Sequence, residues 1–305
     1  MKNRFLKDKV AADIDKHVAR VLGDLGTPEP PLRLEIVRDL LELDRQFYSK
    51  DDPSVLDQVA HKLRLSGKQV LKRPTLVFDA IKKFDLRALY LPDTKRILVD
   101  SDLPKLKHRW AEAHEIGHDL VPWHHEMMLG DTRLTLNPGC HSKLEAEANY
   151  AAGRLLFLQG RFEETVRSSS LNLEWIRATA KKYGNTITTT LWRAVEHLLE
   201  PALALISCHP IHPPDDWGNS DEVEHFVRSR AFADRFAAIR SEDLFAMVQG
   251  YCMQERYRGP LGSREIILPD DNNEDHRFTF ETFFNGHRAL TLALYAGKRN
   301  VVVTV

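Results

Sequence analysis

The chain has 305 residues, of which 43% are hydrophobic and 29% are charged, and its formal net charge is −1. This length allows two modest domains with hydrophobic cores, and the charge balance gives no reason to expect binding to nucleic acid or to an acidic membrane. No stretch approaches the roughly 18 apolar residues of a membrane span. Three widely separated cysteines argue against a disulfide framework, and the first residues lack the apolar core of a signal peptide. We therefore expect a globular protein of a reducing compartment, by default the cytoplasm.

The first segment, residues 1–31, is expected to form one helix and a linker. Residues 4–24 carry apolar side chains at helical spacing, and a stretch rich in Pro and Gly follows at 26–31. The apolar stripe consists of Leu6, Val10, Ile14, Val18 and Val21 or Leu22. We expect this face to dock on the rest of the chain, although pairing with another chain or with a partner would also cover it.

The next part of the chain is predicted to be mainly helical, with helices at 34–47, 53–63 and 70–84. Residues 55–70 have the outline of a helix-turn-helix, but they lack a concentrated basic face for reading bases. We therefore expect these helices to pack against each other, and direct binding to nucleic acid is not expected. A strand pair follows, with Leu86–Leu91 and Arg96–Asp100 joined by a turn.

The sequence His114-Glu115-Ile-Gly-His118 suggests a metal site. Two histidines four residues apart on a helix can bind one divalent ion, and the glutamate between them can take a proton from a metal-bound water. Pro104 suits the first turn of such a helix, with Ser101 or Asp102 as its cap, and Pro122 should end it. Because a chain with 14 histidines can contain this pattern by chance, the assignment needs a third ligand.

That third ligand is expected from a strongly helical stretch at 143–157. Glu145 and Asn149 lie four residues apart on one face, so Glu145 can complete the site while Asn149 orients another ligand. Glu147 points to another side, and we expect it to be a solvated surface carboxylate. Gly117 on the first helix and several small residues on the second would let the two backbones come close. These small residues are Ala148, Ala151, Ala152 and Gly153.

Both stretches resemble motifs of the ImmA/IrrE metallopeptidases. Residues 109–118, R-W-A-E-A-H-E-I-G-H, are similar to that family's R-F-x-x-A-H-E-x-G-H, and residues 145–156 are similar to its E-x-E-A-N-x-F-A-x-x-L-L. The preceding strand pair and a helical pair at 173–196 also fit, so the resemblance covers roughly residues 32–200. The departures are Tyr150 for the usual phenylalanine and Phe157-Leu-Gln where the family tends to have Met-Pro.

The resemblance implies a zinc peptidase of gluzincin type, with His114, His118 and Glu145 as zinc ligands and Glu115 as the general base. It further implies a protein substrate such as a transcriptional repressor or an antitoxin, cleaved or displaced in a stress response, often near mobile elements. The group that stabilises the oxyanion is not evident from the sequence. The nearby candidates are His124, His125, His141 and Tyr150, for each of which a surface or packing role is preferred. Cys140 could bind the zinc and hold the enzyme latent.

The remaining residues, 201–305, are expected to form an α+β accessory domain that restricts access or recognises the substrate. We predict a buried strand at 201–208, helices at 220–237 and 242–256, and strands at 264–268, 278–284 and 287–295. Asn285-Gly286 marks a hairpin turn, and another hairpin through 297–300 should lead to 301–305. His209 and His212 have metal-like spacing, but a rigid Pro-rich linker is the preferred interpretation.

The sequence thus predicts an α+β protein that contains a zincin-type metallopeptidase domain at 32–200, and a zinc-dependent endopeptidase is the preferred function. Two rivals remain open. One is a zinc-stabilised binding protein or anti-repressor without catalysis, and the other is a DNA-binding regulator with a vestigial peptidase fold.

Overall fold

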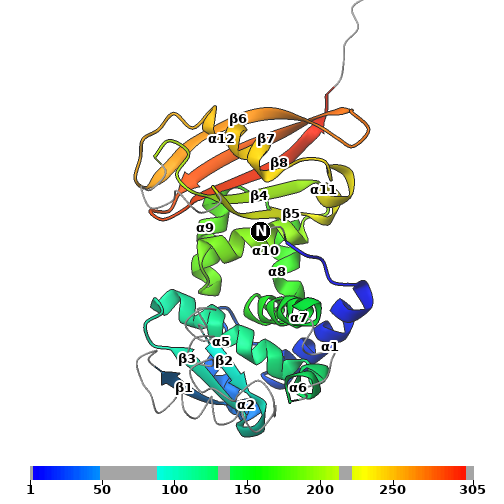
Figure 1. Cartoon of the computed structure of the whole chain (residues 1–305), viewed down its shortest axis with the longest axis vertical. Helices are drawn as coiled ribbons and strands as arrows, with labels where there is room; N and C mark the ends of the chain where they lie inside the picture. The colour runs from blue at the N-terminus through cyan, green and yellow to red at the C-terminus, as the bar shows by residue number, and fades with distance from the viewer. Residues whose placement is uncertain (1–2, 49–87, 130–137, 213–221, 300–305) are drawn as a thin grey trace, which may run out of the picture. The chain divides into compact units, whose positions relative to one another are not determined.

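The computed structural model describes residues 3–48, 88–129, 138–212 and 222–299 (Figure 1). Their contacts divide the chain into two units. The HExxH unit comprises Leu6–Arg161 and Tyr183–Asn185, and the C-terminal unit comprises Met1–Phe5, Phe162–Lys182 and Thr186–Val305. Each unit combines helices with one sheet, so the predicted α+β class is confirmed. The main boundary between the two units thus lies near residue 162. The domain limits at 32–200 and 201–305 stay a prediction.

The sheet of the HExxH unit has the strand order β1-β3-β2. The strands β2 (Ala88–Leu91) and β3 (Arg96–Asp100) form the predicted antiparallel hairpin, joined by a 3-10 turn at Pro92–Thr94. The strand β1 (Asp44–Tyr48) pairs with β3 in parallel. Every backbone group of the central strand β3 can therefore find a partner on one side or the other.

The prediction of a helix over residues 34–47 was wrong in its second half. Helix α2 (Leu34–Leu41) ends where Glu42 adopts a left-handed conformation with φ 58°, and β1 begins two residues later. The left-handed residue turns the chain out of the helix, and the parallel partner β3 lies about fifty residues further along the sequence. A periodicity read within one segment cannot reveal such a distant partner.

Helix α1 (Asp8–Asp24) docks within the HExxH unit, as predicted. It buries Ile14, Val18, Val21 and Leu22 and packs against α7 (Pro138–Leu156). The contact includes an ion pair in which Arg154 Nε lies 2.6 Å from Asp15 Oδ1. The apolar stripe read from the sequence is therefore covered by the chain itself.

Helix α5 (Lys105–Leu120) occupies the predicted position before Pro122. Its N-cap residue is Pro104 and no side chain caps the helix, so the expected cap by Ser101 or Asp102 was wrong. Val121 is extended after the helix ends, as the residue before a proline prefers, and Pro122 opens α6 (Pro122–Leu129). The short break between the two helices lets α6 turn back toward α5, which it contacts.

The C-terminal unit contains an antiparallel sheet of five strands in the order β5-β4-β8-β7-β6. Its strands are β4 (Ala202–Ser207), β5 (Val223–Arg228), β6 (Gly259–Pro269), β7 (Asp275–Phe284) and β8 (Ala289–Lys298). The hairpin around Asn285-Gly286 is confirmed, since Phe284 pairs with Ala289. Its helices are α8 (Gly160–Arg167), α9 (Leu173–Tyr183), α10 (Ile187–His197), α11 (Arg230–Arg235) and α12 (Ser241–Gln249). Only the first two residues of α8 and the last residue of α9 belong to the HExxH unit.

The predicted helix at 220–237 was wrong, because this segment forms β5 and then the short helix α11. Val223, Phe226 and Val227 are buried where β5 pairs with β4, and the hydroxyl of Ser229 caps α11 by accepting from the N–H of Phe232. The predicted helix at 242–256 exists but ends at Gln249. The first helix therefore begins later than its apolar pattern suggested, and the second helix ends earlier.

Several expected elements lie outside the described residues. These are the helices at 53–63 and 70–84, the helix-turn-helix outline at 55–70, and the last strand at 301–305. Within the part of the chain that the structure describes, no helix has both the length and the apolar character that a membrane span requires.

Candidate metal centre

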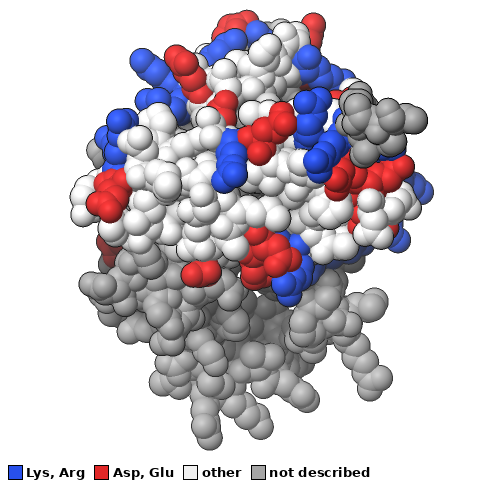
Figure 2. All heavy atoms as spheres, turned by 90° about the horizontal axis from the view of Figure 1, so that it is seen from above, with Lys and Arg blue, Asp and Glu red and all other residues white. Residues whose placement is uncertain are grey.

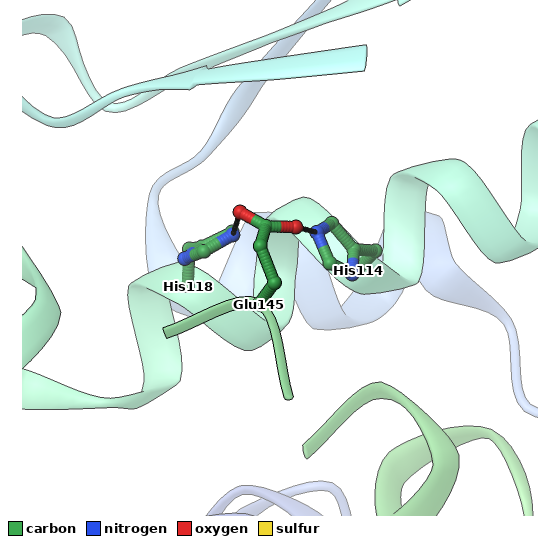
Figure 3. Close-up of side chains that lie close together, drawn as sticks. All are labelled: His114, His118 and Glu145. Carbon is green, nitrogen blue, oxygen red and sulfur yellow. Dashed lines mark ion pairs between the residues drawn. The ribbon is translucent and has the colours of Figure 1, made fainter. Parts of the chain in front are cut away.

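Three of the predicted site residues lie together in the HExxH unit. His114 and His118 project from one face of α5, and Glu145 reaches them from α7 (Figure 3). Glu145 Oε2 lies 3.1 Å from His114 Nε2, and Glu145 Oε1 lies 3.5 Å from His118 Nε2. The imidazoles are largely covered, whereas the Glu145 side chain is 40% exposed. The group is therefore enclosed on the side of the helices and open to solvent on the side of the carboxylate.

Asn149 fixes the orientation of His114, as the sequence predicted. Its Oδ1 lies 3.2 Å from His114 Nδ1. An amide oxygen only accepts hydrogen bonds, so Nδ1 of His114 donates and carries a proton. In the neutral ring this leaves the lone pair of Nε2 directed at Glu145.

The charges within the group favour a cation at this point. Burial opposes the charged form of His114, but the hydrogen bond with Glu145 and the negative charges of Glu115 and Glu145 outweigh it and raise the pKa of His114. Burial alone would favour the neutral acid of Glu145, yet hydrogen bonds with His114 and His118 hold the pKa of Glu145 well below its usual range. Burial lowers the pKa of His118 to about 4. The group thus offers a carboxylate and a neutral imidazole, and without a metal ion His114 supplies the balancing proton.

Glu147 was expected to be a solvated carboxylate, and this prediction was wrong. The residue is 1% exposed. Its Oε2 accepts from Trp123 Nε1 at 2.6 Å and lies 3.1 Å from His124 Nε2. The opposite ring nitrogen of His124, Nδ1, lies 3.0 Å from His118 Nδ1. The side of α7 away from Glu145 is thus covered by α6, and a chain of hydrogen bonds connects Glu147 to His118.

Glu115 lies inside the protein, beside the edge strand β2. Burial raises the pKa of Glu115 to about 7, while the charge of His114 and a hydrogen bond from the backbone N–H of Tyr90 favour its ionised form. A carboxylate with a pKa near neutrality can accept a proton and release it again under the same conditions. A general base, the role expected of Glu115 from the sequence, needs this ability.

The four candidates for stabilising an oxyanion have different surroundings. Tyr150 donates to the carboxylate of Asp15 on α1 and so serves the docking of that helix. His124 is fully buried behind His118. His125 lies 3.3 Å from Asp119 and contacts the Tyr90 hydroxyl. The side chains of His141 and Cys140 lie outside the described residues.

The residues present fit a zinc ion. Two imidazole nitrogens and one carboxylate are a ligand set that catalytic zinc takes, with a fourth position left open. Ligand atoms of a tetrahedral zinc site lie about 3.4 Å apart, given bonds of about 2.0–2.1 Å. His114, His118 and Glu145 each offer one donor atom within 4.8 Å of the others, with Glu145 Oε2 3.1 Å from His114 Nε2 and Glu145 Oε1 3.5 Å from His118 Nε2. The partly exposed carboxylate leaves a side of the group open.

A second group with metal-like composition occurs in the C-terminal unit. Asp270, Glu274 and His276 lie close together, but Asp270 is occupied by the backbone N–H groups of Asn272 and Glu274 and by His276. The partners of Asp270 are thus supplied by the turn that follows it and by the first residues of β7. His209 stabilises the turn that follows it, because its Nδ1 accepts hydrogen bonds from the N–H groups of Ile211 and His212. This agrees with the interpretation of the segment as a linker.

The charged side chains do not form an area of one sign on the face shown in Figure 2. Lys and Arg lie beside Asp and Glu across this face. Among the ion pairs of the C-terminal unit, Arg240 pairs with Asp243 and Lys298 pairs with Glu274. The described residues on this face therefore do not form the basic area typical of a nucleic-acid interface.

The comparisons with known proteins support the fold and do not identify the family. Neither a protein-family profile nor a curated protein matches the chain, so the resemblance to the ImmA/IrrE metallopeptidases stays a prediction. Among solved structures, the chain is similar to a Mycobacterium tuberculosis transcriptional regulator, with 16% identity and a TM-score of 0.50. The similarity covers 93% of this chain and 88% of the regulator. At this identity the likeness concerns the fold alone.

Proposed function

We propose that the protein is a zinc-dependent endopeptidase that hydrolyses a peptide bond in a protein substrate. The observation that carries the proposal is the convergence of His114 and His118 on the carboxylate of Glu145, at separations that suit one zinc ion. The motif needed a third ligand, and the residue proposed for that role lies next to both histidines.

The residues around the group have complementary roles in this reaction. His114, His118 and Glu145 would hold the zinc ion, which would supply Lewis-acid chemistry for the scissile carbonyl and for the attacking water. Glu115, whose pKa is raised to about 7 by burial, accepts the proton of the attacking water and delivers it to the leaving amine. Asn149 holds the ring of His114 in place.

The substrate that we propose is a transcriptional repressor or an antitoxin, cleaved in response to stress. This part of the proposal depends on the resemblance of residues 109–118 and 145–156 to the ImmA/IrrE motifs. The C-terminal unit would then recognise the substrate or restrict access to Glu115.

Zinc content is the first test. Elemental mass spectrometry of the purified protein should find about one zinc per chain, and Glu145→Ala should lose most of it because two imidazoles alone hold zinc weakly. Wild-type protein that stays free of metal after incubation with zinc would contradict the proposal.

A second test separates the enzyme from the binding protein. Glu115→Gln keeps the shape of the side chain but removes the proton acceptor, so it should retain zinc while hydrolysis falls by roughly 100-fold or more. If this variant keeps full biological activity, the non-catalytic interpretation is correct. A salt-dependent complex of the wild type with duplex DNA would instead favour the regulator with a vestigial peptidase fold.

A further inference from the structure

The hydrogen bonds behind His118 form a continuous buried chain from the proposed ligand to a carboxylate. His118 Nδ1 lies 3.0 Å from His124 Nδ1, and His124 Nε2 lies 3.1 Å from Glu147 Oε2. His118 is 4% exposed, His124 is 0% exposed and Glu147 is 1% exposed. Water is therefore excluded from these three side chains, and each depends on its neighbour for a hydrogen-bond partner.

The direction of these hydrogen bonds follows from the two end groups of the series, His118 and Glu147. A metal on Nε2 of His118 uses that lone pair, so the proton of the neutral ring must be on Nδ1. His118 then donates to Nδ1 of His124, which must be a bare acceptor. The proton of neutral His124 is consequently on Nε2, from which it is donated to Glu147, and a carboxylate can accept it. With metal bound, no other arrangement of protons in the two neutral rings satisfies all three groups.

We propose that His124 and Glu147 are positioning residues that hold His118 in its metal-binding tautomer and orientation. This inference rests on the proposed zinc site and extends it by two residues that do not touch the metal. His118 would be held through His124 by a charged acceptor, whereas His114 is held by the neutral amide of Asn149. The carboxylate makes the rings more electron-rich, so it should strengthen the bond of His118 to the metal.

The position of Glu147 is itself maintained by neighbouring side chains. Trp123 Nε1 donates to the same oxygen at 2.6 Å, and Lys143 Nζ lies 3.7 Å from Oε1. Trp123 and His124 are consecutive residues at the start of α6, so one turn of that helix provides both donors to Glu147. The helix α6 thereby links the proposed ligand on α5 to the carboxylate on α7.

Metal affinity is the measurement that tests this inference. The dissociation constant for Zn²⁺ is obtained by competition with a chelating dye for the full chain and for His124→Leu and Glu147→Leu. Each substitution should weaken binding roughly 10- to 100-fold, which is the usual effect of removing a hydrogen-bond partner of a ligand. Glu147→Gln keeps an acceptor for His124 and should restore much of the affinity. His125→Leu is the matched control, since the same residue type one position along α6 contacts Tyr90 and Asp119 instead, and its affinity should equal that of the wild type.

A second measurement does not depend on whether the variants fold. In the zinc-loaded wild type, long-range proton–nitrogen NMR correlations should show His118 protonated at Nδ1 and His124 protonated at Nε2. The opposite tautomer of His124, or variants that fold and bind zinc as tightly as the wild type, would overturn the inference while leaving the zinc site intact. A wild type that binds no zinc would overturn both the inference and the proposed function.

Discussion

A Cβ atom on Gly117 would lie 2.6 Å from the backbone carbonyl oxygen of Ala148. Gly117 sits on α5 next to His118, and Ala148 sits on α7 three residues after Glu145. The backbones of the two helices therefore touch at the level of the proposed metal site. This close approach is what allows a glutamate side chain on α7 to reach both histidines.

Gly117→Ala should consequently weaken the metal site without removing any ligand. The added methyl group must push α7 away from α5, since the atom that it meets belongs to the backbone and cannot rotate aside. We expect a loss of roughly 1–3 kcal/mol in the free energy of unfolding and weaker zinc binding. Thermal unfolding and zinc titration of the same variant measure both effects.

Gly23→Ala provides the matched control for this substitution. Gly23 lies in α1 of the same unit and has nothing within 4 Å of an added Cβ. Alanine in a helix is more favourable than glycine by up to about 1 kcal/mol, so this variant should be equally or more stable and should bind zinc normally. If both variants behave alike, the contact between Gly117 and Ala148 does not determine the site.

The adjacent residues Asn149 and Tyr150 should respond differently to removal of their polar groups. Tyr150→Phe removes the hydroxyl that donates to Asp15, so it should reduce the free energy of unfolding by about 0.5–1.5 kcal/mol and leave zinc content and hydrolysis unchanged. Asn149→Ala releases the ring of His114 and should weaken zinc binding. Loss of hydrolysis in Tyr150→Phe with zinc retained would mean that the Tyr150 hydroxyl takes part in catalysis.

Zinc affinity should fall as the pH is lowered, with about one proton competing for the site. The pKa of His114 is raised, mainly because its hydrogen bond with Glu145 outweighs burial, so zinc must displace a proton from His114 at mildly acidic pH. Burial lowers the pKa of His118 to about 4, so His118 adds a second competing proton only near that pH. The affinity should therefore fall about tenfold per pH unit between about pH 4.5 and 6.

The measurement is best made on Glu115→Gln, because the pKa of Glu115 is raised to about 7 by burial and its own proton would otherwise contribute. This variant loses the charge of Glu115 but keeps the hydrogen bond with Glu145, which contributes more to raising the pKa of His114. Competition with a chelating dye at a series of pH values gives the slope directly. A fall of about a hundredfold per pH unit over the same range would mean that two protons compete, and the assignment of a low pKa to His118 would then be wrong.

The thiols of Cys208 and Cys252 should react slowly with alkylating reagents in the folded protein. Burial raises the pKa of both thiols to about 11, and the thiolate is the reactive form. At about pH 8 we expect labelling at least roughly 100-fold slower than in denaturant, with a rate that rises as the pH increases. Peptide mapping after timed alkylation measures each cysteine separately, and rapid labelling of either residue without denaturant would show that its environment is open.

The sequence alone determined the features that depend on local periodicity and spacing. His114 and His118 lie on one face of a helix because they are four residues apart. The helix of Glu145, the hairpin at Asn285-Gly286 and the apolar face of α1 were also recognised from local sequence patterns. Each of these patterns is complete within about twenty consecutive residues, so no distant contact was needed to recognise them.

Tertiary contacts decided what lies around those elements. Residues 44–48 form a strand because β3 pairs with them, although their own sequence continues the apolar pattern of a helix. Glu147 was predicted to be solvated from its angle around α7, but α6 folds over that side and brings Trp123 and His124 to it. The surroundings of a side chain depend on every element packed against it, and helical periodicity gives only the direction in which the side chain leaves its own helix.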